Sequence, residues 1–201
     1  THFHNDHIGD VPMLFFALRH GMPPGRTESL QVFGPRGARA LLDGMAAIFG
    51  DHMTDPGFPV EVLEVHEDEP VVLDDVVRIT PHRTPHTAAS VAYRIDTPAG
   101  AIGYTGDTGY SEEVASFLQS CEILISECSL PDGTEVETHL TPVKLAGMAV
   151  IARPRQLVVT HVYPPLEPTT IPARLAQAGW RGQSVVAFDG LTLTPYDSRR
   201  T

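Results

Sequence analysis

The placement of histidine and aspartate is the feature that most constrains how this 201-residue chain can fold. The chain opens with the cluster HFHNDH, which crowds His2, His4, Asp6 and His7 into six residues. Residues of the same two types recur far along the sequence, each at the end of a predicted strand or in the loop just after one: His86, Asp107 and His161. Binding and catalytic residues gather in loops that a rigid scaffold positions. We therefore expect a sheet that brings these loops together at one edge.

The hydrophobic pattern predicts both strands and helices. Short apolar or alternating runs predict strands over residues 30–33, 60–65, 76–80, 90–95, 101–105, 123–126, 156–160 and 184–188, and a turn at Asp189-Gly190 predicts a hairpin that returns over 191–194. Helices are predicted over residues 11–21, 35–50, 111–120, 141–152 and 170–179, from apolar periodicity, capping residues and terminal glycines. Strands that occur in blocks and also alternate with helices indicate an α/β fold, with one domain over residues 1–201.

The charge of the chain argues against a grip on long nucleic acid. The formal net charge is −11, and the arginines form only scattered pairs, such as Arg36 with Arg39, Arg153 with Arg155, and Arg199 with Arg200. A protein that holds a long polyanion should instead show basic clusters. The chain also has no run of about 18 apolar residues, so we expect no membrane partner.

The cysteine content indicates the cellular compartment. Cys121 and Cys128 are the only cysteines in the sequence. They are expected to be reduced, partly buried thiols of an intracellular protein, and no signal peptide is visible. The prediction is a cytoplasmic protein.

The opening cluster has the spacing of metal ligands. His2 and His4 are two residues apart, so in an extended chain their side chains point the same way and can hold one metal. Asp6 and His7 follow where the chain should turn towards the helix at residue 11, so we expect their side chains to point away from the first pair and to suit a second metal. Imidazole suits Zn, Fe, Ni or Cu, and a carboxylate can bridge two cations.

The cluster also carries a family resemblance. HFHNDH matches the HxHxDH signature of the metallo-β-lactamase superfamily, and the resemblance extends from Thr1 over nearly the whole chain. It implies an αβ/βα sandwich whose first strands precede the HxHxDH loop. The chain starts at that loop, so we expect those N-terminal strands to be missing from it.

The resemblance assigns the ligands of two divalent ions, for which we expect zinc, with manganese or iron as alternatives. One ion would be held by His2, His4 and His86, the other by Asp6, His7 and His161, and Asp107 would bridge them. His82 competes with His86 for its place. His86 is preferred because HTAASVAYRI resembles the way in which the family's third ligand enters its next strand.

Within the superfamily the chain is most similar to the ribonuclease Z-like phosphodiesterases. LISECSL resembles their HEAT segment with Glu127 at the acidic position, although Ser126 replaces its histidine, and THLTP resembles their HST segment with His139 at the histidine position. In that group the Glu–His pair assists proton transfer to the leaving oxygen. GPRGARALL, residues 34–42, resembles the segment that leads into a tRNA-gripping arm, but the residues that follow are too few for such an arm and not basic.

These assignments predict a hydrolase. Two divalent metals about 3.5–4 Å apart lower the pKa of a bridging water towards about 7, so a hydroxide can attack a phosphate in line. Asp6 could orient or deprotonate that water, and His139, held by Glu127, could protonate the leaving alkoxide. The leading hypothesis is a phosphodiesterase acting on a small anionic substrate such as a cyclic nucleotide.

Three other functions stay open from sequence alone. A ribonuclease Z-like tRNA 3′-processing endonuclease would need a basic channel, part of which a homodimer partner could supply. A lactonase or thioesterase could use the same metal site but would have little use for the pair of Glu127 and His139. A metal-stabilised binding protein without catalytic activity is the fourth hypothesis.

Overall fold

The computed structural model describes residues 1–21 and 24–194, and these form two compact units, residues 1–66 and 67–201. The single domain expected over residues 1–201 stays a prediction, because two compact units can belong to one domain or to two. Arg199 and Arg200, one of the arginine pairs noted above, lie outside the described residues. In the part of the chain that is described, no helix is both long and apolar enough to cross a membrane.

The first unit is built around a two-stranded parallel sheet. Its strands are β1 (Leu30–Pro35) and β2 (Val60–Val65), paired in register from Leu30 opposite Val60 to Pro35 opposite Val65. Its helices are α1 (Asn5–Ile8), α2 (Val11–His20), α3 (Ala38–Phe49) and α4 (Asp51–Thr54). Parallel strands need a crossover connection, and α3 and α4 provide it. Phe15 of α2 and Phe58 are both buried, with ring centroids 6.1 Å apart, so they form part of this unit's core.

The second unit contains a seven-stranded mixed sheet whose strands follow their sequence order. They are β3 (Val71–Leu73), β4 (Val77–Arg83), β5 (Val91–Thr97), β6 (Gly100–Tyr104), β7 (Ile123–Glu127), β8 (Gln156–Thr160) and β9 (Gln183–Val186). Neighbouring strands from β3 to β6 are antiparallel, and those from β6 to β9 are parallel. Strand β4 therefore runs in the same direction as β6, β7 and β8, and the carboxyl ends of these strands share one edge.

The parallel half of the sheet is crossed by helices α5 (Glu112–Phe117), α6 (Pro142–Ala152) and α7 (Ile171–Gln177), with the 3₁₀ turn η1 (Pro168–Thr170) before α7. These helices pack on one another and, with the strands, bury a core that includes Leu118, Leu145, Leu157 and Leu175, each at most 1% exposed. The sequence locates the helix starts well. Ser111 and Thr141 are the N-caps of α5 and α6, and their side chains accept hydrogen bonds from the backbone amides of Val114 and Lys144.

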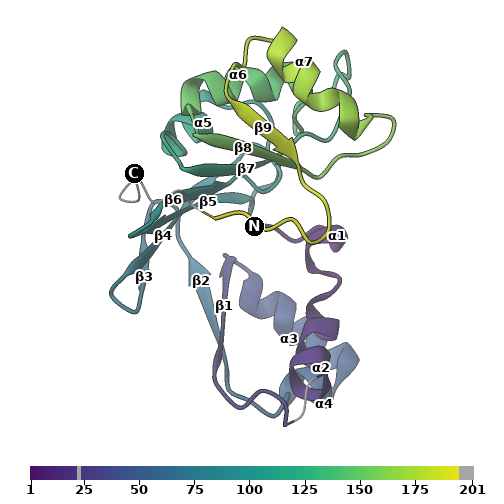
Figure 1. The fold of residues 1–201 in the computed structure, drawn as a ribbon. Coiled ribbons are helices and arrows are strands. Elements are labelled where there is room, and N and C mark those ends of the chain that lie inside the picture. Colours follow the sequence, from purple (N-terminus) through teal and green to yellow (C-terminus); the bar gives the residue numbers. More distant parts are fainter. Residues whose placement is uncertain (22–23, 195–201) are drawn as a thin grey trace. The chain divides into compact units, whose positions relative to one another are not determined.

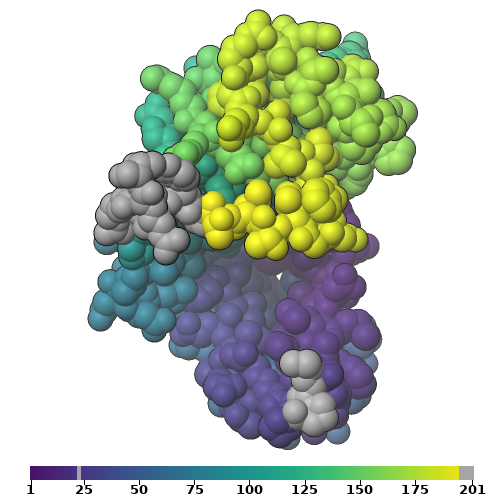
Figure 2. Space-filling model, viewed as in Figure 1, coloured from purple at the N-terminus to yellow at the C-terminus, as the bar shows by residue number. Residues whose placement is uncertain are grey.

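Most expected elements are confirmed, and one is wrong. The turn at Asp189-Gly190 forms, with the Leu191 amide donating to the Phe188 carbonyl at 3.0 Å. However, residues 191–194 do not return as a strand, and β9 stops at Val186. Figure 2 shows these last described residues, in yellow, lying at the surface. A turn signal sets the reversal of the chain but not the pairing that should follow it.

Candidate metal centre

The sheet edge of the second unit gathers the predicted site residues of that unit. His86 lies in the loop after β4, Asp107 follows β6 and His161 follows β8. Glu127 is the last residue of β7, and His139 lies in the loop that leads to α6. The parallel direction of these strands explains the gathering, because their carboxyl ends lie side by side.

Asp107 lies between two imidazoles. Its Oδ2 atom is 3.6 Å from Nε2 of His86 and 3.5 Å from Nε2 of His161. Metal–ligand bonds of about 2.0–2.2 Å place neighbouring ligand atoms roughly 3–3.5 Å apart. The spacing of these three atoms therefore fits a carboxylate and two imidazoles that share a divalent ion or bridge a pair.

The other ring nitrogen of each histidine is already engaged. Nδ1 of His86 donates to the Thr138 carbonyl at 2.9 Å, and Nδ1 of His161 is 2.8 Å from the Ser129 hydroxyl. A hydrogen bond at Nδ1 sets the tautomer and leaves Nε2 unprotonated. An unprotonated Nε2 atom can bind a cation, and at His161 this atom also lies 3.1 Å from the Tyr163 hydroxyl. The two tautomers are the second observation that fits the metal implied by the resemblance.

Glu127 is the hub of a buried hydrogen-bond network. The residue is 1% exposed, and its carboxylate accepts from the Thr108 amide at 2.7 Å and the Leu140 amide at 3.1 Å. It also accepts from His139 Nδ1 at 3.0 Å and from the Ser129 hydroxyl at 2.6 Å. A buried carboxylate requires such compensation. The network fixes its position and that of the His139 ring.

Ser129 connects Glu127 to His161. Because its hydroxyl proton goes to Glu127, its oxygen must accept from Nδ1 of His161. The residue is completely buried, so water does not replace either bond. Glu127 therefore orients His139 directly and His161 through Ser129.

His139 lies within reach of the same centre. Atoms of Asp107, His139 and His161 all lie within 4.8 Å of one another, and the rings of His139 and His161 are stacked with centroids 5.9 Å apart. Geometry alone would allow His139 to be a third ligand. Its hydrogen bond to Glu127 also suits a proton donor, the role that the resemblance implies.

His161 and its neighbour Tyr163 form a tight corner. The backbone of His161 has a φ of 55°, in the left-handed region that residues other than glycine rarely occupy. Tyr163, two residues later, places its hydroxyl 3.1 Å from Nε2 of His161. Such a backbone outlier often accompanies a functional position.

His82, the rival of His86, lies in a different setting. Its Nδ1 atom is 2.9 Å from Asp68, and its ring stacks on Phe117 with centroids 4.7 Å apart. With Glu67 and Asp68 it forms a separate group of potential ligands. His82 is thus occupied elsewhere in the second unit, whereas His86 meets Asp107.

The opening cluster forms a compact group within the first unit. Nε2 of His2 and Nδ1 of His4 are 3.0 Å apart, and Asp6 Oδ2 is 3.4 Å from Nε2 of His7. The short helix α1 carries Asp6 and His7. The rings of His7 and His2 have centroids only 4.1 Å apart. The expectation that His7 points away from the first pair is therefore wrong, because the turn of α1 brings its ring back beside His2.

Two neighbours of the predicted residues were not identified from the sequence. Ser129 stands two residues after Glu127, and Tyr163 stands two residues after His161. Alternation along an extended segment could have suggested that such positions share a face. Their partners, however, come from distant loops and depend on the folded chain.

The environment of Cys128, next to Glu127, keeps its thiol neutral. Burial and the nearby carboxylate of Glu127 raise the pKa of Cys128 to about 12. Both cysteines are free and buried, as expected. Neither belongs to the groups of potential ligands found among the described residues.

Comparison with known proteins identifies the family and the fold. The family model described as a beta-lactamase superfamily domain matches residues 1–162. The chain is 27% identical over 170 residues to the uncharacterized protein Rv1339 of Mycobacterium tuberculosis, covering 82% of this chain and 60% of that one. It is 23% identical over 219 residues to ribonuclease Z of Methanocaldococcus jannaschii, covering 81% of this chain and 67% of the enzyme. The chain thus spans only about 60% of the length of its curated mycobacterial relatives.

A solved structure gives the same result for the fold. The metallo-beta-lactamase fold protein YhfI of Bacillus subtilis superimposes with a TM-score of 0.78 at 21% identity, covering 95% of this chain and 73% of YhfI. The predicted fold class, an α/β fold of metallo-β-lactamase type, is confirmed.

Proposed function

The chain belongs to the beta-lactamase superfamily, and from this premise we propose that it acts as a metal-dependent phosphodiesterase on a small phosphodiester such as a cyclic nucleotide. We propose zinc as the metal, with manganese or iron as alternatives, and two ions per chain. The proposed ligands are the residues of the two local clusters described above, namely His2, His4, Asp6, His7, His86, Asp107 and His161.

Two divalent ions, when bound, would neutralise the oxygens of a phosphodiester and lower the pKa of water held at the centre. The protein's own residues would supply the rest. Asp107 would hold both cations with one carboxylate, and Asp6 would orient the attacking water. His86 and His161 would present unprotonated Nε2 atoms because Thr138 and Ser129 engage their Nδ1 atoms.

The observation that carries the proposal is the contact between His139 and Glu127. Nδ1 of His139 lies 3.0 Å from the buried carboxylate, which would stabilise the protonated imidazole, and the Nε2 proton would then be the one transferred. A poor leaving group such as a nucleoside alkoxide needs that proton. A thioester expels a thiolate, which leaves without a donor placed in this way, so the pair favours phosphodiester cleavage over thioester hydrolysis.

A tRNA 3′-processing endonuclease is the second candidate, favoured by the relative named ribonuclease Z. The net charge of −11 and the scattered arginines argue against a long polyanion as the substrate. A small substrate, a homodimer and a cytoplasmic location all stay predictions.

The test compares leaving groups. The metal-loaded, full-length protein should hydrolyse cyclic nucleotides and bis-p-nitrophenyl phosphate, with a lactone and precursor tRNA as competing substrates. His139→Ala should lose roughly 10²–10⁴-fold in rate on the cyclic nucleotide, the usual contribution of acid–base catalysis. It should hardly affect bis-p-nitrophenyl phosphate, because p-nitrophenolate leaves without a proton.

A matched control is His82→Ala, which removes a histidine that stacks on Phe117 away from this centre. Equal losses on both phosphodiesters in His139→Ala would refute the role of His139 as proton donor. Turnover of the lactone or precursor tRNA, with none of a cyclic nucleotide, would refute the proposed substrate class.

A further inference from the structure

A cavity of about 680 Å³ adjoins His86 within the second unit. Its walls come from Arg83 at the end of β4, the loop that follows, Tyr110, Glu137 and Thr138, and Lys144 of α6. This volume is typical of sites for small organic ligands. The proposed function uses only His86 and the backbone carbonyl of Thr138 among these residues, so the other side chains of the cavity have no assigned role.

Tyr110 offers the cavity a fixed aromatic surface. Its ring packs against α6 at Gly147, where a Cβ atom would come within 3.1 Å of the ring. Its hydroxyl donates to Glu112 at 3.4 Å. The residue is still 42% exposed. A ring held on one side and open to a cavity is suited to stacking with a planar ligand.

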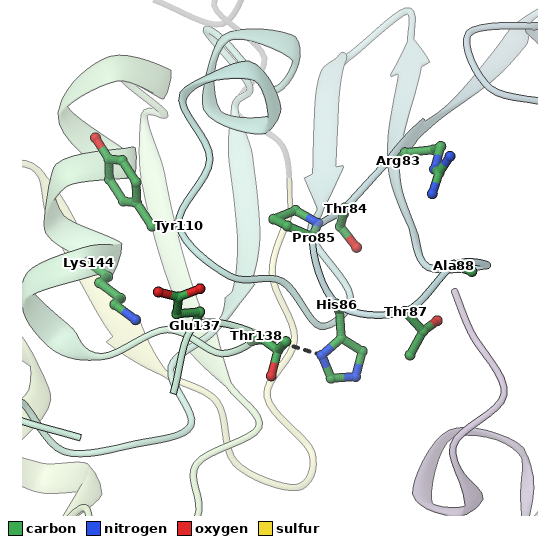
Figure 3. A pocket seen from close by; sticks show the side chains of 10 residues that line it. All are labelled: Arg83, Thr84, Pro85, His86, Thr87, Ala88, Tyr110, Glu137, Thr138 and Lys144. Atoms are coloured by element: carbon green, nitrogen blue, oxygen red, sulfur yellow. Dashed lines mark hydrogen bonds between the residues drawn. The ribbon is translucent and has the colours of Figure 1, made fainter. Parts of the chain in front are cut away.

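Polar groups of opposite character stand beside this ring. Lys144 is the only lysine in the sequence, and its Nζ donates to the Val136 carbonyl at 2.6 Å, which fixes the ammonium at the cavity wall. Figure 3 shows Tyr110, Lys144 and Glu137 together on one side of Pro85 and His86, with Arg83 on the other. Within residues 1–21 and 24–194, the structure gives the carboxylate of Glu137 no hydrogen bond or ion pair. The cavity thus presents an acceptor and a donor next to an aromatic face.

We propose that this cavity binds the nucleobase of a nucleoside phosphodiester, an inference that rests on the proposed phosphodiesterase function. The base would stack on Tyr110, donate an exocyclic amino hydrogen to Glu137 and accept from Lys144. A second phosphate group would be attracted by Arg83 and Lys144, but Glu137 would repel it and the ring of Tyr110 would have no role. An adenine or cytosine ring offers both the donor and the acceptor that these side chains require.

The position of His86 connects the cavity to the chemistry. His86 lines the cavity and is also a proposed metal ligand whose Nε2 atom faces Asp107. A phosphodiester held at this histidine could therefore place its base among Tyr110, Lys144 and Glu137. The cavity would determine which nucleoside is accepted and would leave the bond-breaking step to the metal centre.

The test measures binding, so that it does not depend on turnover. Isothermal titration of the metal-loaded protein should show AMP binding more tightly than ribose 5-phosphate, which carries the same phosphate without a base. Tyr110→Leu should weaken AMP binding by about 5- to 150-fold, the usual contribution of one base stacked on an aromatic ring, and leave ribose 5-phosphate unchanged.

Glu137→Ala tests the polar contact, and Glu135→Ala is its matched control, an exposed glutamate outside the lining of this cavity. Glu137→Ala should weaken AMP by about tenfold and should hardly affect purine riboside monophosphate, which lacks the amino group. Glu135→Ala should change neither. Equal affinities for AMP and ribose 5-phosphate, or AMP binding that is unaffected by both Tyr110→Leu and Glu137→Ala, would overturn the proposal.

The same data separate this proposal from the proposed function. Base-dependent AMP binding without hydrolysis of any phosphodiester would support the cavity and refute the phosphodiesterase. Hydrolysis of cyclic AMP with a KM that Tyr110→Leu leaves unchanged would support the phosphodiesterase and refute the cavity's role.

Discussion

Replacing Ser129 by alanine removes a single hydroxyl that makes two hydrogen bonds inside the second unit. One goes to the carboxylate of Glu127 at 2.6 Å, and the other comes from Nδ1 of His161 at 2.8 Å. Ser129 is completely buried, so water does not readily take the place of the hydroxyl. The substitution should therefore affect both the stability of the fold and the orientation of a proposed metal ligand.

The size of each effect follows from these contacts. A hydrogen bond to a charged group contributes about 1.5–3 kcal/mol, so the metal-free protein should lose about 2 kcal/mol of unfolding free energy. His161 would lose the acceptor that holds its ring and sets its tautomer. Loss of such an outer hydrogen bond typically costs about 10- to 100-fold in metal affinity.

The assay is competition for Zn²⁺ against a chromophoric chelator, together with urea unfolding of the metal-free protein. Ser126→Ala is the matched control. Ser126 is also completely buried, but its hydroxyl bonds to the backbone carbonyl of Glu127 and to Thr105, not to His161. Ser129→Thr keeps the hydroxyl and should restore most of the affinity.

The result that would refute this reasoning is a Ser129→Ala protein that binds zinc as tightly as Ser126→Ala and the original chain. Ser129 would then contribute only to packing. A loss of stability without a loss of affinity would show that the hydrogen bonds of Ser129 support the fold but do not prepare His161 to bind the metal.

Three further predictions follow from the site and from the buried groups. Asp107→Ala should lose bound metal and nearly all activity, whereas His139→Ala should keep both ions, as elemental analysis would show. If His139→Ala also loses the metal, His139 is a metal ligand and not only a proton donor. Burial raises the pKa of Cys121 to about 11 and the pKa values of Cys128 and Tyr93 to about 12, so the unfolded chain loses these protons at lower pH than the folded one. The unfolding free energy should therefore fall as the pH rises from about 9 towards 12. Urea titrations at several pH values would show this fall, and a flat profile would contradict it. The two thiols should react with a disulfide reagent only after denaturation, and rapid reaction of the native protein would show that they are accessible.

The sequence predicts the order of the secondary structure well, because hydrophobic period and capping residues are local signals. Thr141 followed by Pro142, for example, marks the start of α6 correctly. The short elements α1, α4 and β3 were missed, since three or four residues are too few to show a period. The failed strand at residues 191–194 shows the complementary error, in which a local turn signal was given a partner that tertiary structure does not provide.

The candidate site could likewise be predicted only in part. Ligand types and their places after strands can be read from the sequence, as with Asp107 after β6 and His161 after β8. The hydrogen bonds that prepare them cannot, because the acceptor for His86 is the carbonyl of Thr138, which lies 52 residues further along the chain. Any residue has a backbone carbonyl, so no sequence pattern marks this one.

The direction of the strands in the second unit also determines which of its loops can be altered without affecting the metal centre. The strands that carry His86, Asp107 and His161 all end at one edge, so the turns at the opposite edge contain none of these residues. The turn at residues 98–99, between β5 and β6, is one of them. An affinity tag, a dye-labelled cysteine or a surface tether inserted there would leave the centre intact, whereas the same insertion near Thr138 would displace the carbonyl that orients His86. The geometry of this sheet thus marks where the protein can be modified for immobilisation or single-molecule work.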